Sequence, residues 1–340
     1  MNIKDFDYQL PADFIAQEPL TIRHNSKLMV LNKNTGKIQH KNFYQIVDLF
    51  QPEDLLVLNN SKVLPMRLFG QKKNTGGEIE ALLINPISSN IWRTLLKPGK
   101  RIHNGTIISF SEELEGIVID KDNTDSTYLV QMNYTGIFND ILYKIGKMPT
   151  PPYIKKEIND SSSYQTVYAQ EEGSIAAPTA GFHFTKELLA SIAKKGVKII
   201  YITLHIGRGT FEMIREDQIE KHKMKPELYT ISEKNSQIIE QSLKKGTRII
   251  GVGTSVTRTL ESSVKKDKIT TGTYWTDLFI YPGFNFKVVD ALITNFHLPR
   301  STPLMLASAF AGKENLLNAY QEAIKNKYRF YSFGDSMFIN

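Results

Sequence analysis

The feature that most constrains the fold is a change of pattern part-way along the chain. Between residues 67 and 147, short segments alternate apolar and polar residues and are separated by Asn, Asp, Gly and Pro turn signals. Short strands recurring at about ten-residue spacings predict a small antiparallel β-barrel. On both sides of this stretch, longer apolar strands alternate with amphipathic helices, a pattern typical of a sheet covered by helices.

We therefore expect an α/β fold, a layered mixed sheet with helices on its faces, interrupted by a small antiparallel β-barrel domain. The α/β domain would be discontinuous, built from residues 1–66 and 148–340, and the inserted barrel domain would cover residues 67–147. Pro65 and the Pro-rich segment 148–153 mark the two borders. A chain of 340 residues is long enough for two domains of about 150 residues each.

Local signals place the main elements of the larger domain. Thr185 can cap a helix that stops at Gly196, and the helix over 233–245 ends at Gly246. Further helices are expected over 43–50, 255–266 and 314–325. Strands are expected over 26–32, 54–59, 197–204, 247–252, 274–280, 287–294 and 329–333.

The residues that are missing exclude several classes of protein. The chain has no cysteine, which excludes disulfides, thiolate nucleophiles, iron–sulfur clusters and Cys-based zinc sites. The first residues include acids and a proline where a signal peptide needs an apolar run. No stretch reaches the roughly eighteen apolar residues that a membrane-spanning helix needs. We expect a soluble, cytoplasmic protein with no membrane partner.

The net charge of +7, with an isoelectric point near 9.2, favours a polyanionic partner such as nucleic acid. Between Phe69 and Lys147, nine basic residues balance nine acidic ones. The whole basic excess therefore belongs to the larger domain, which we expect to make most of the phosphate contacts.

Three histidines share one local pattern, since each lies in a loop beside the end of a predicted strand or helix. His183 occurs in APTAGFHFT, His205 in TLHIGRGTF and His297 in TNFHLPRST. In open α/β sheets, ligands bind beyond the carboxyl ends of the strands, where such loops meet. At each place the alternative is a tightly packed loop with a structural histidine. No spacing among the histidines is typical of a metal site, and we assign no metal.

The segment IIGVGTSVTRTLE combines a strand, a glycine turn and a helix start. Free N–H groups and the helix dipole make such a turn suitable for a carboxylate or phosphate. The third glycine of a dinucleotide-binding loop is missing, which disfavours a nicotinamide dehydrogenase. Arg258 and Glu261 lie one turn apart on this helix, so a simple surface ion pair is the alternative to a binding role.

Taken together, the motifs resemble those of one family, the S-adenosylmethionine:tRNA ribosyltransferase-isomerases of queuosine biosynthesis. The resemblance runs from Phe6 to Met337. The matching blocks, in order, are FDYQLPADFIAQEPL, LLVLNNSKVLPMRLFG, TGGEIEALL, PPYI, YQTVYA, APTAGFHFT, TLHIGRGTF, LYTI, GVGTSVTRTLES, DLFIYPGFNFKVVDALITNFHLPRSTPLML and YRFYSFGDSM.

The resemblance implies a reaction and its partners. The ribosyl moiety of S-adenosylmethionine would move to 7-aminomethyl-7-deazaguanine at the wobble position of a tRNA anticodon. The product would be epoxyqueuosine, with adenine and methionine released. S-adenosylmethionine would be a co-substrate, no further cofactor is expected, and we expect a monomer.

We expect this chemistry to use histidines, because their pKa lies near neutrality. The candidate catalytic residues are His183 and His205, with His297 in second place. The candidate residues for binding the donor are Thr179, Gly181, Gly207, Gly209, Thr210, Gly253, Thr254, Arg258, Glu261 and Asn295. The candidate residues for binding tRNA are Arg23, Lys62, Arg67, Lys97 and Arg300.

Two other functions remain open from the residues alone. An RNA methyltransferase that uses S-adenosylmethionine would release S-adenosylhomocysteine instead of adenine. A non-catalytic RNA-binding protein would release neither S-adenosylhomocysteine nor adenine. That function does not explain why three histidines lie beside strand and helix ends.

Overall fold

The computed structural model describes residues 1–340 except 123–124, 157, 159, 208, 210–212 and 267. The chain divides into two compact units. The first comprises Met1–Lys62, Pro152–Glu171 and Ala177–Asn340, and the second comprises Val63–Pro151 and Glu172–Ala176. The boundaries of independently folding domains expected from the sequence, 66/67 and 147/148, stay a prediction that limited proteolysis can test.

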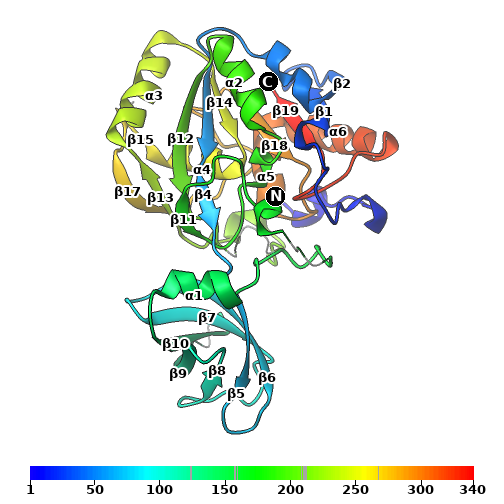
Figure 1. The fold of residues 1–340 in the computed structure, drawn as a ribbon. Helices are drawn as coiled ribbons and strands as arrows, with labels where there is room; N and C mark the ends of the chain where they lie inside the picture. Colours follow the sequence, from blue (N-terminus) through cyan, green and yellow to red (C-terminus); the bar gives the residue numbers. More distant parts are fainter. Residues whose placement is uncertain (123–124, 157, 159, 208, 210–212, 267) are drawn as a thin grey trace. The chain divides into compact units, whose positions relative to one another are not determined.

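The first unit is built on a nine-stranded mixed sheet in the order β17-β13-β12-β3-β14-β18-β19-β1-β2 (Figure 1). The strands are β1 (Lys27–Leu31), β2 (Ile38–Asn42), β3 (Leu55–Asn59), β12 (Lys198–Leu204), β13 (Glu227–Ile231), β14 (Ile249–Val252), β17 (Gly272–Thr276), β18 (Ala291–Asn295) and β19 (Ser336–Ile339). At its centre β12, β3, β14 and β18 run parallel, so their carboxyl ends share one edge.

Helices cover both faces of this sheet. The α-helices of the first unit are α2 (Lys186–Lys194), α3 (Glu233–Lys245), α4 (Thr254–Ser263), α5 (Thr302–Ala311) and α6 (Lys313–Lys325). The 3-10 helices are η1 (Ile3–Phe6), η2 (Ala12–Phe14), η3 (Arg23–Asn25), η4 (Phe43–Leu49), η5 (Ser161–Tyr164), η6 (Thr179–Gly181) and η8 (Ile219–Lys221). Leu188, Leu189 and Ile192 of α2 pack with η4 against one face of the sheet, and α4 packs on β14 from the other face.

The second unit contains a closed antiparallel barrel in the order β10-β7-β6-β5-β8-β9. Its strands are β5 (Arg67–Lys72), β6 (Glu78–Pro86), β7 (Ile91–Lys97), β8 (Ile107–Ser109), β9 (Leu114–Asp122) and β10 (Thr127–Tyr134). Alternate residues such as Ile79, Ala81 and Leu83 point into a buried core, because successive side chains of a strand face opposite sides. Helix α1 (Phe138–Ile145) adds Ile141 and Leu142 to this core.

Two short ladders complete the described structure. Strand β4 (Ser61–Val63) pairs with β11 (Glu171–Ser174), and β15 (Val264–Lys265) pairs with β16 (Lys268–Ile269). The fold class expected from the sequence, a mixed α/β sheet together with a small antiparallel barrel, is confirmed.

The predicted strand over 329–333 is wrong. In that segment Tyr331 has φ +69°, and the Asp335 carboxylate accepts the backbone N–H groups of Arg329 and Lys27, both at 2.8 Å. The chain therefore turns here, and the last strand, β19, forms afterwards between β18 and β1. The turn is rich in aromatic residues, which are common in strands, and for this reason the sequence predicted a strand here.

Other expected elements are present with different bounds. The helix expected over 255–266 ends at Ser263, where β15 begins, and η4 is a 3-10 helix. The strand expected over 274–280 ends at Thr276. Strands β2 and β13 and helix α1 were not expected from the sequence.

Candidate functional site at the carboxyl edge of the sheet

A cleft of about 900 Å³, counting its open mouth, lies at the carboxyl edge of the parallel strands. Its walls include Gly253–Ser255 after β14 and Thr294–Leu298 at the end of β18, with Ile206 after β12. Residues 177–180 close one side. This is the position at which open α/β sheets bind ligands, as the sequence analysis expected for these loops.

The amino end of α4 opens directly into the cleft. Gly253 precedes the helix with φ +89°, a conformation that favours glycine, and its N–H donates to the Ile293 carbonyl at 2.7 Å. Gly253 has no side chain to cap the helix, and Thr254 and Ser255 of its first turn line the cleft. An uncapped helix start offers N–H groups and positive potential to an anion.

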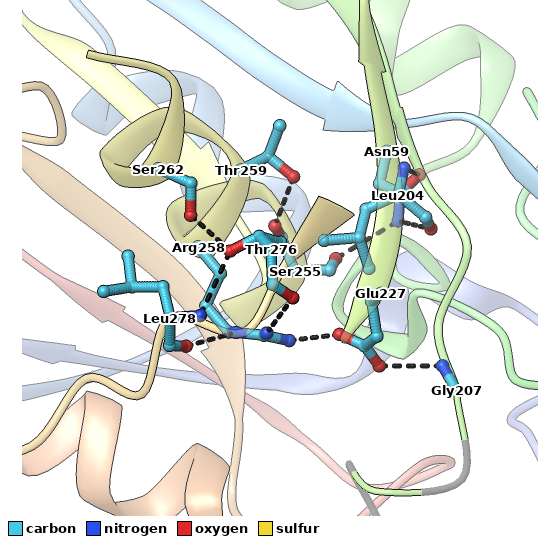
Figure 2. Close-up of polar contacts among 10 residues, drawn as sticks. All are labelled: Asn59, Leu204, Gly207, Glu227, Ser255, Arg258, Thr259, Ser262, Thr276 and Leu278. Atoms are coloured by element: carbon cyan, nitrogen blue, oxygen red, sulfur yellow. Dashed lines mark hydrogen bonds and ion pairs between the residues drawn. The ribbon is translucent and has the colours of Figure 1, made fainter. Parts of the chain in front are cut away.

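Asn59 connects this helix start to the neighbouring strand. Its amide Nδ2 donates to the Leu204 carbonyl at 3.0 Å and to Ser255 Oγ at 3.2 Å (Figure 2). Its Oδ1 accepts the Leu204 N–H at 3.1 Å. A single buried amide at the end of β3 therefore holds the end of β12 and the first turn of α4 in register.

His183 is buried and does not line the cleft. Thr179 Oγ1 donates to Asn295 Oδ1 at 3.0 Å, and Asn295 Nδ2 donates to His183 Nε2 at 3.2 Å. The neutral ring then donates from Nδ1 to Ser26 Oγ, 2.7 Å away. Burial lowers the pKa of His183 to about 3, with the nearby charges of Arg329 and Arg23 acting in the same direction. This ring is therefore neutral near pH 7 and contacts the cleft through Asn295, which lines it.

His297 lines the cleft directly. Its Nε2 lies 2.8 Å from Thr294 Oγ1, and its backbone N–H donates to the Tyr320 hydroxyl at 2.8 Å. Burial lowers the pKa of His297 to about 3. Among the three expected histidines, His297 is the one with direct access to the cleft.

His205 faces a different environment. Its side chain is half-buried, and its neighbour Ile206, not His205, lines the cleft. Burial lowers its pKa, while the charge of Glu171 acts in the opposite direction. Within the described part of the chain, its buried Nδ1 has no hydrogen-bond partner.

Arg258 and Glu227 form a buried ion pair in the wall of the cleft (Figure 2). Arg258 Nε also donates to the Leu278 carbonyl at 2.9 Å, and the Gly207 N–H donates to Glu227 Oε1 at 2.7 Å. The side chains are only 8% and 3% exposed, so two charges removed from water neutralise each other. Glu227 was not expected from the sequence, where its only signal is an acid at the start of an alternating strand.

Glu261 does not pair with Arg258. Its carboxylate accepts the backbone N–H groups of Lys287, Val288 and Val289 at 2.9, 3.0 and 3.0 Å. Burial raises its pKa, and these hydrogen bonds act against that rise. Glu261 lies outside the cleft lining and supports the segment that leads into β18. The alternative of a surface ion pair between Arg258 and Glu261 is therefore wrong, since both side chains are buried and each binds other groups.

The glycines expected to bind the donor occupy different environments. Gly181 lies outside the cleft lining, and a Cβ there would come within 2.1 Å of the Tyr168 hydroxyl, so tight packing requires this glycine. Gly207 binds Glu227, and Gly209 lies against the Lys225 side chain. Thr210 lies outside the described residues.

Arg23, Arg67 and Arg300, all expected to bind tRNA, already contact other groups of the protein. Arg23 donates to the carbonyls of Gln165 at 2.6 Å and Ser162 at 3.0 Å. Arg67 Nε lies 3.3 Å from a Glu80 oxygen, and Arg300 pairs with Asp7. Lys62 is half-buried, and Lys97 is exposed.

The described residues contain no group of three or more His, Asp or Glu side chains arranged to hold a metal ion. None of the helices that can be described is long and apolar enough to cross a membrane.

Comparisons with known proteins identify the family. A model of the family described as queuosine biosynthesis protein matches residues 3–339. The chain belongs to this family. It is 50% identical to the S-adenosylmethionine:tRNA ribosyltransferase-isomerase of Halothermothrix orenii over 342 aligned residues, which cover 100% of each chain.

A solved structure supports the same family. The crystal structure of S-adenosylmethionine tRNA ribosyltransferase from Thermotoga maritima, at 2.00 Å resolution, matches 99% of this chain and 100% of its own. The sequence identity is 37% and the TM-score is 0.57. The family resemblance predicted from the sequence motifs is confirmed.

Proposed function

We propose that this chain transfers and isomerises the ribosyl moiety of S-adenosylmethionine onto 7-aminomethyl-7-deazaguanine at the wobble position of a tRNA anticodon. The product is epoxyqueuosine, with adenine and methionine released. The observation that carries the proposal is the 50% identity to a ribosyltransferase-isomerase along the full length of both chains. The cleft at the carboxyl edge of the parallel strands supports the proposal, because open α/β sheets bind ligands at that edge.

The donor supplies most of its own activation. Its sulfonium charge acidifies the C5′ hydrogens and makes methionine a good leaving group. Adenine leaves as its bond to the ribose breaks, and the acceptor amine loses a proton and forms a new C–N bond to the sugar. The deprotonated C5′ closes a carbon ring through a new C–C bond, and a sugar oxygen then displaces methionine from C5′ to form the epoxide. The protein has to accept a C5′ proton, return a proton to adenine and keep the acceptor amine neutral.

His297 is our first candidate for this proton transfer, because among the three histidines it is the one that lines the cleft. Its ring is neutral at pH 7, but a pKa near 3 makes it a weak base, so the assignment rests on its position and not on its basicity. His183 acts as a positioning residue that fixes the Asn295 amide, with Nδ2 toward the imidazole and Oδ1 toward Thr179. His205 remains a candidate, because its buried Nδ1 has no partner among the described residues and its neighbour Ile206 lines the cleft.

The amino end of α4, with Gly253 and Thr254, holds the methionine carboxylate of the donor or a phosphate of the tRNA. The Arg258–Glu227 pair orients polar groups of the donor. Because the two charges cancel, the pair adds no net positive charge that would oppose the cationic sulfonium.

The partners follow from the reaction. S-adenosylmethionine is a co-substrate, and the macromolecular partner is a tRNA that carries the deazaguanine precursor. We propose that the enzyme acts as a monomer in the cytoplasm. The five residues Arg23, Lys62, Arg67, Lys97 and Arg300 stay predicted phosphate contacts, and binding should weaken steeply with salt.

One incubation tests the proposal. The full chain is mixed with S-adenosylmethionine and tRNA that carries 7-aminomethyl-7-deazaguanine, and tRNA with guanine at the wobble position is the control. Free adenine together with a mass gain on the wobble nucleoside supports the proposal. S-adenosylhomocysteine would indicate a methyltransferase instead, and tRNA binding with neither product would indicate a non-catalytic RNA-binding protein.

Two histidine variants, one in the cleft and one outside it, test whether His297 takes part in the proton transfer. His297→Asn should lower turnover at saturating donor at least tenfold, whereas His40→Asn should not, because His40 lies on β2 and bonds to Tyr328 outside the cleft. Equal turnover in the two variants would remove His297 from the proton transfer.

A further inference from the structure

The barrel unit, neutral by count, gathers part of its positive charge on one surface. An open groove lies between the segment 99–104 and the strands β7, β9 and β10. Its charged and titratable lining residues are Lys100, Arg101, His103 and Lys121, and no described lining residue is acidic. We call this surface the basic groove.

The cations of the basic groove differ from most other cations of the barrel. Lys100, Arg101 and Lys121 are exposed and have no carboxylate partner among the described residues. Elsewhere on the barrel, Lys73 lies 2.7 Å from Glu115 and Lys144 lies 2.7 Å from Glu113. These acids of the barrel therefore pair with cations outside the groove, and none of the ion pairs among the described residues includes a groove cation.

Acids close to the groove are occupied as well. Asp122 and Asp125 lie 2.8 and 3.7 Å from Arg93. Lys97 follows a different pattern, because in the strand register it stands opposite Glu80 and it does not line the groove. Lys97, the barrel residue expected to bind tRNA together with Arg67, therefore lies outside the groove.

The segment that carries these charges is held in place. The Tyr128 hydroxyl donates to the Gly99 carbonyl at 3.0 Å, and Lys72 Nζ donates to the Arg101 carbonyl at 2.7 Å. Ile102 is buried in the barrel core, and the Gly105 N–H donates to the Val118 carbonyl at 2.7 Å. Lys121 Nζ lies 5.7 Å from the centre of the Tyr128 ring. A fixed backbone lets the groove present its charges with a small loss of entropy on binding.

We propose that the basic groove binds the sugar-phosphate backbone of the substrate tRNA. Exposed cations with no carboxylate partner among the described residues, on a fixed concave surface, are the chemistry that binds phosphates, because they release the counterions of the RNA. The inference rests on the proposed function for the identity of the RNA. It assigns tRNA contacts to Lys100, Arg101 and Lys121 in the barrel unit, although that unit has no basic excess.

The test compares two double variants that each remove two exposed lysine charges from the barrel. Lys100→Gln/Lys121→Gln acts in the groove, and Lys73→Gln/Lys144→Gln removes two paired lysines elsewhere. The full chain is titrated with the substrate tRNA at several salt concentrations. The groove variant should reduce the slope of log K against log salt by about 1.4–1.8, since each phosphate contact contributes about 0.7–0.9. The control variant should change the slope by less than half of that.

Kinetics give a second measurement. Adenine release at saturating tRNA should be unchanged in the groove variant, while the KM for tRNA rises about tenfold or more. Equal salt slopes and equal KM values in the two double variants would overturn the inference. Adenine release by the unmodified chain is judged separately, so failure of the groove and failure of the proposed function are distinguishable.

Discussion

The buried pair of Glu227 and Arg258 makes a prediction that joins stability to donor binding. In Glu227→Gln the side chain keeps its shape and can still accept the Gly207 N–H, but Arg258 loses its counter-charge. Breaking a buried ion pair costs about 3–5 kcal/mol, and the remaining hydrogen bonds place this variant near 3 kcal/mol. For a unit of this size the melting temperature should fall by roughly 6–12 °C.

The same substitution should weaken the use of the donor, because both side chains line the cleft. Loss of a hydrogen bond that involves a charged group costs about 1.5–3 kcal/mol, or roughly 10–100-fold in kcat/KM for S-adenosylmethionine. Adenine release at varied donor concentration measures this loss at a temperature well below the melting point of the variant.

A matched control exists in the same unit. Asp54 is also buried, and its carboxylate binds Arg248 with N–O distances of 2.6 and 3.1 Å, outside the cleft lining. Asp54→Asn should lower the melting temperature comparably and leave kcat/KM for the donor within twofold of wild type. The reasoning is refuted if Glu227→Gln melts like wild type, or if its kinetics match those of Asp54→Asn.

The remaining predictions concern pH and backbone conformation. The folded protein holds the pKa of His183 at about 3, below the value of about 6.5 in the unfolded chain. As the pH falls below about 6.5, the unfolded chain therefore binds a proton at this histidine before the folded protein does. The free energy of unfolding should then decrease toward pH 3 by up to about 1.4 kcal/mol per pH unit. Chemical denaturation at pH 7 and pH 5 should show a smaller loss in His183→Gln than in wild type, and an equal loss would contradict this assignment. Gly253→Ala should strain the start of α4 by roughly 1–3 kcal/mol, since φ is +89° there, and should raise the KM for the donor at least tenfold. The control is Gly246→Ala at the end of α3, where the left-handed conformation is less strained. This control should leave the KM for the donor unchanged.

Local signals predicted the elements whose ends are set by their own residues. Helix α3 runs over Glu233–Lys245 as expected, because Ser232 caps its first turn and Gly246 adopts φ +65° after its last. Thr185 likewise caps α2 through the Leu188 N–H at 3.2 Å. The alternating segments of the barrel were recognisable for the same reason, since a period of two identifies a half-buried strand wherever it occurs.

Contacts between distant segments decided the rest of the fold. Strand β19, near the last residue of the sequence, lies between β18 and β1 in the sheet. No local sequence pattern predicts which strands it pairs with. The aromatic segment before it resembles a strand, yet the Asp335 carboxylate and the left-handed Tyr331 make it a turn. Tyr331 and Ser332 consequently line the cleft, which a strand over 329–333 did not suggest.

The candidate site shows the same division. The sequence by itself determined the family, the fold class and the four loops that meet at the cleft, because those depend on residue types in a fixed order. Only the tertiary structure decided that His297 faces the cleft, that His183 reaches it through Asn295, and that Arg258 pairs with Glu227 and not with Glu261. Burial and charge pairing depend on which side chains the fold brings together across the sheet. The spacing of residues along the chain does not predict those contacts.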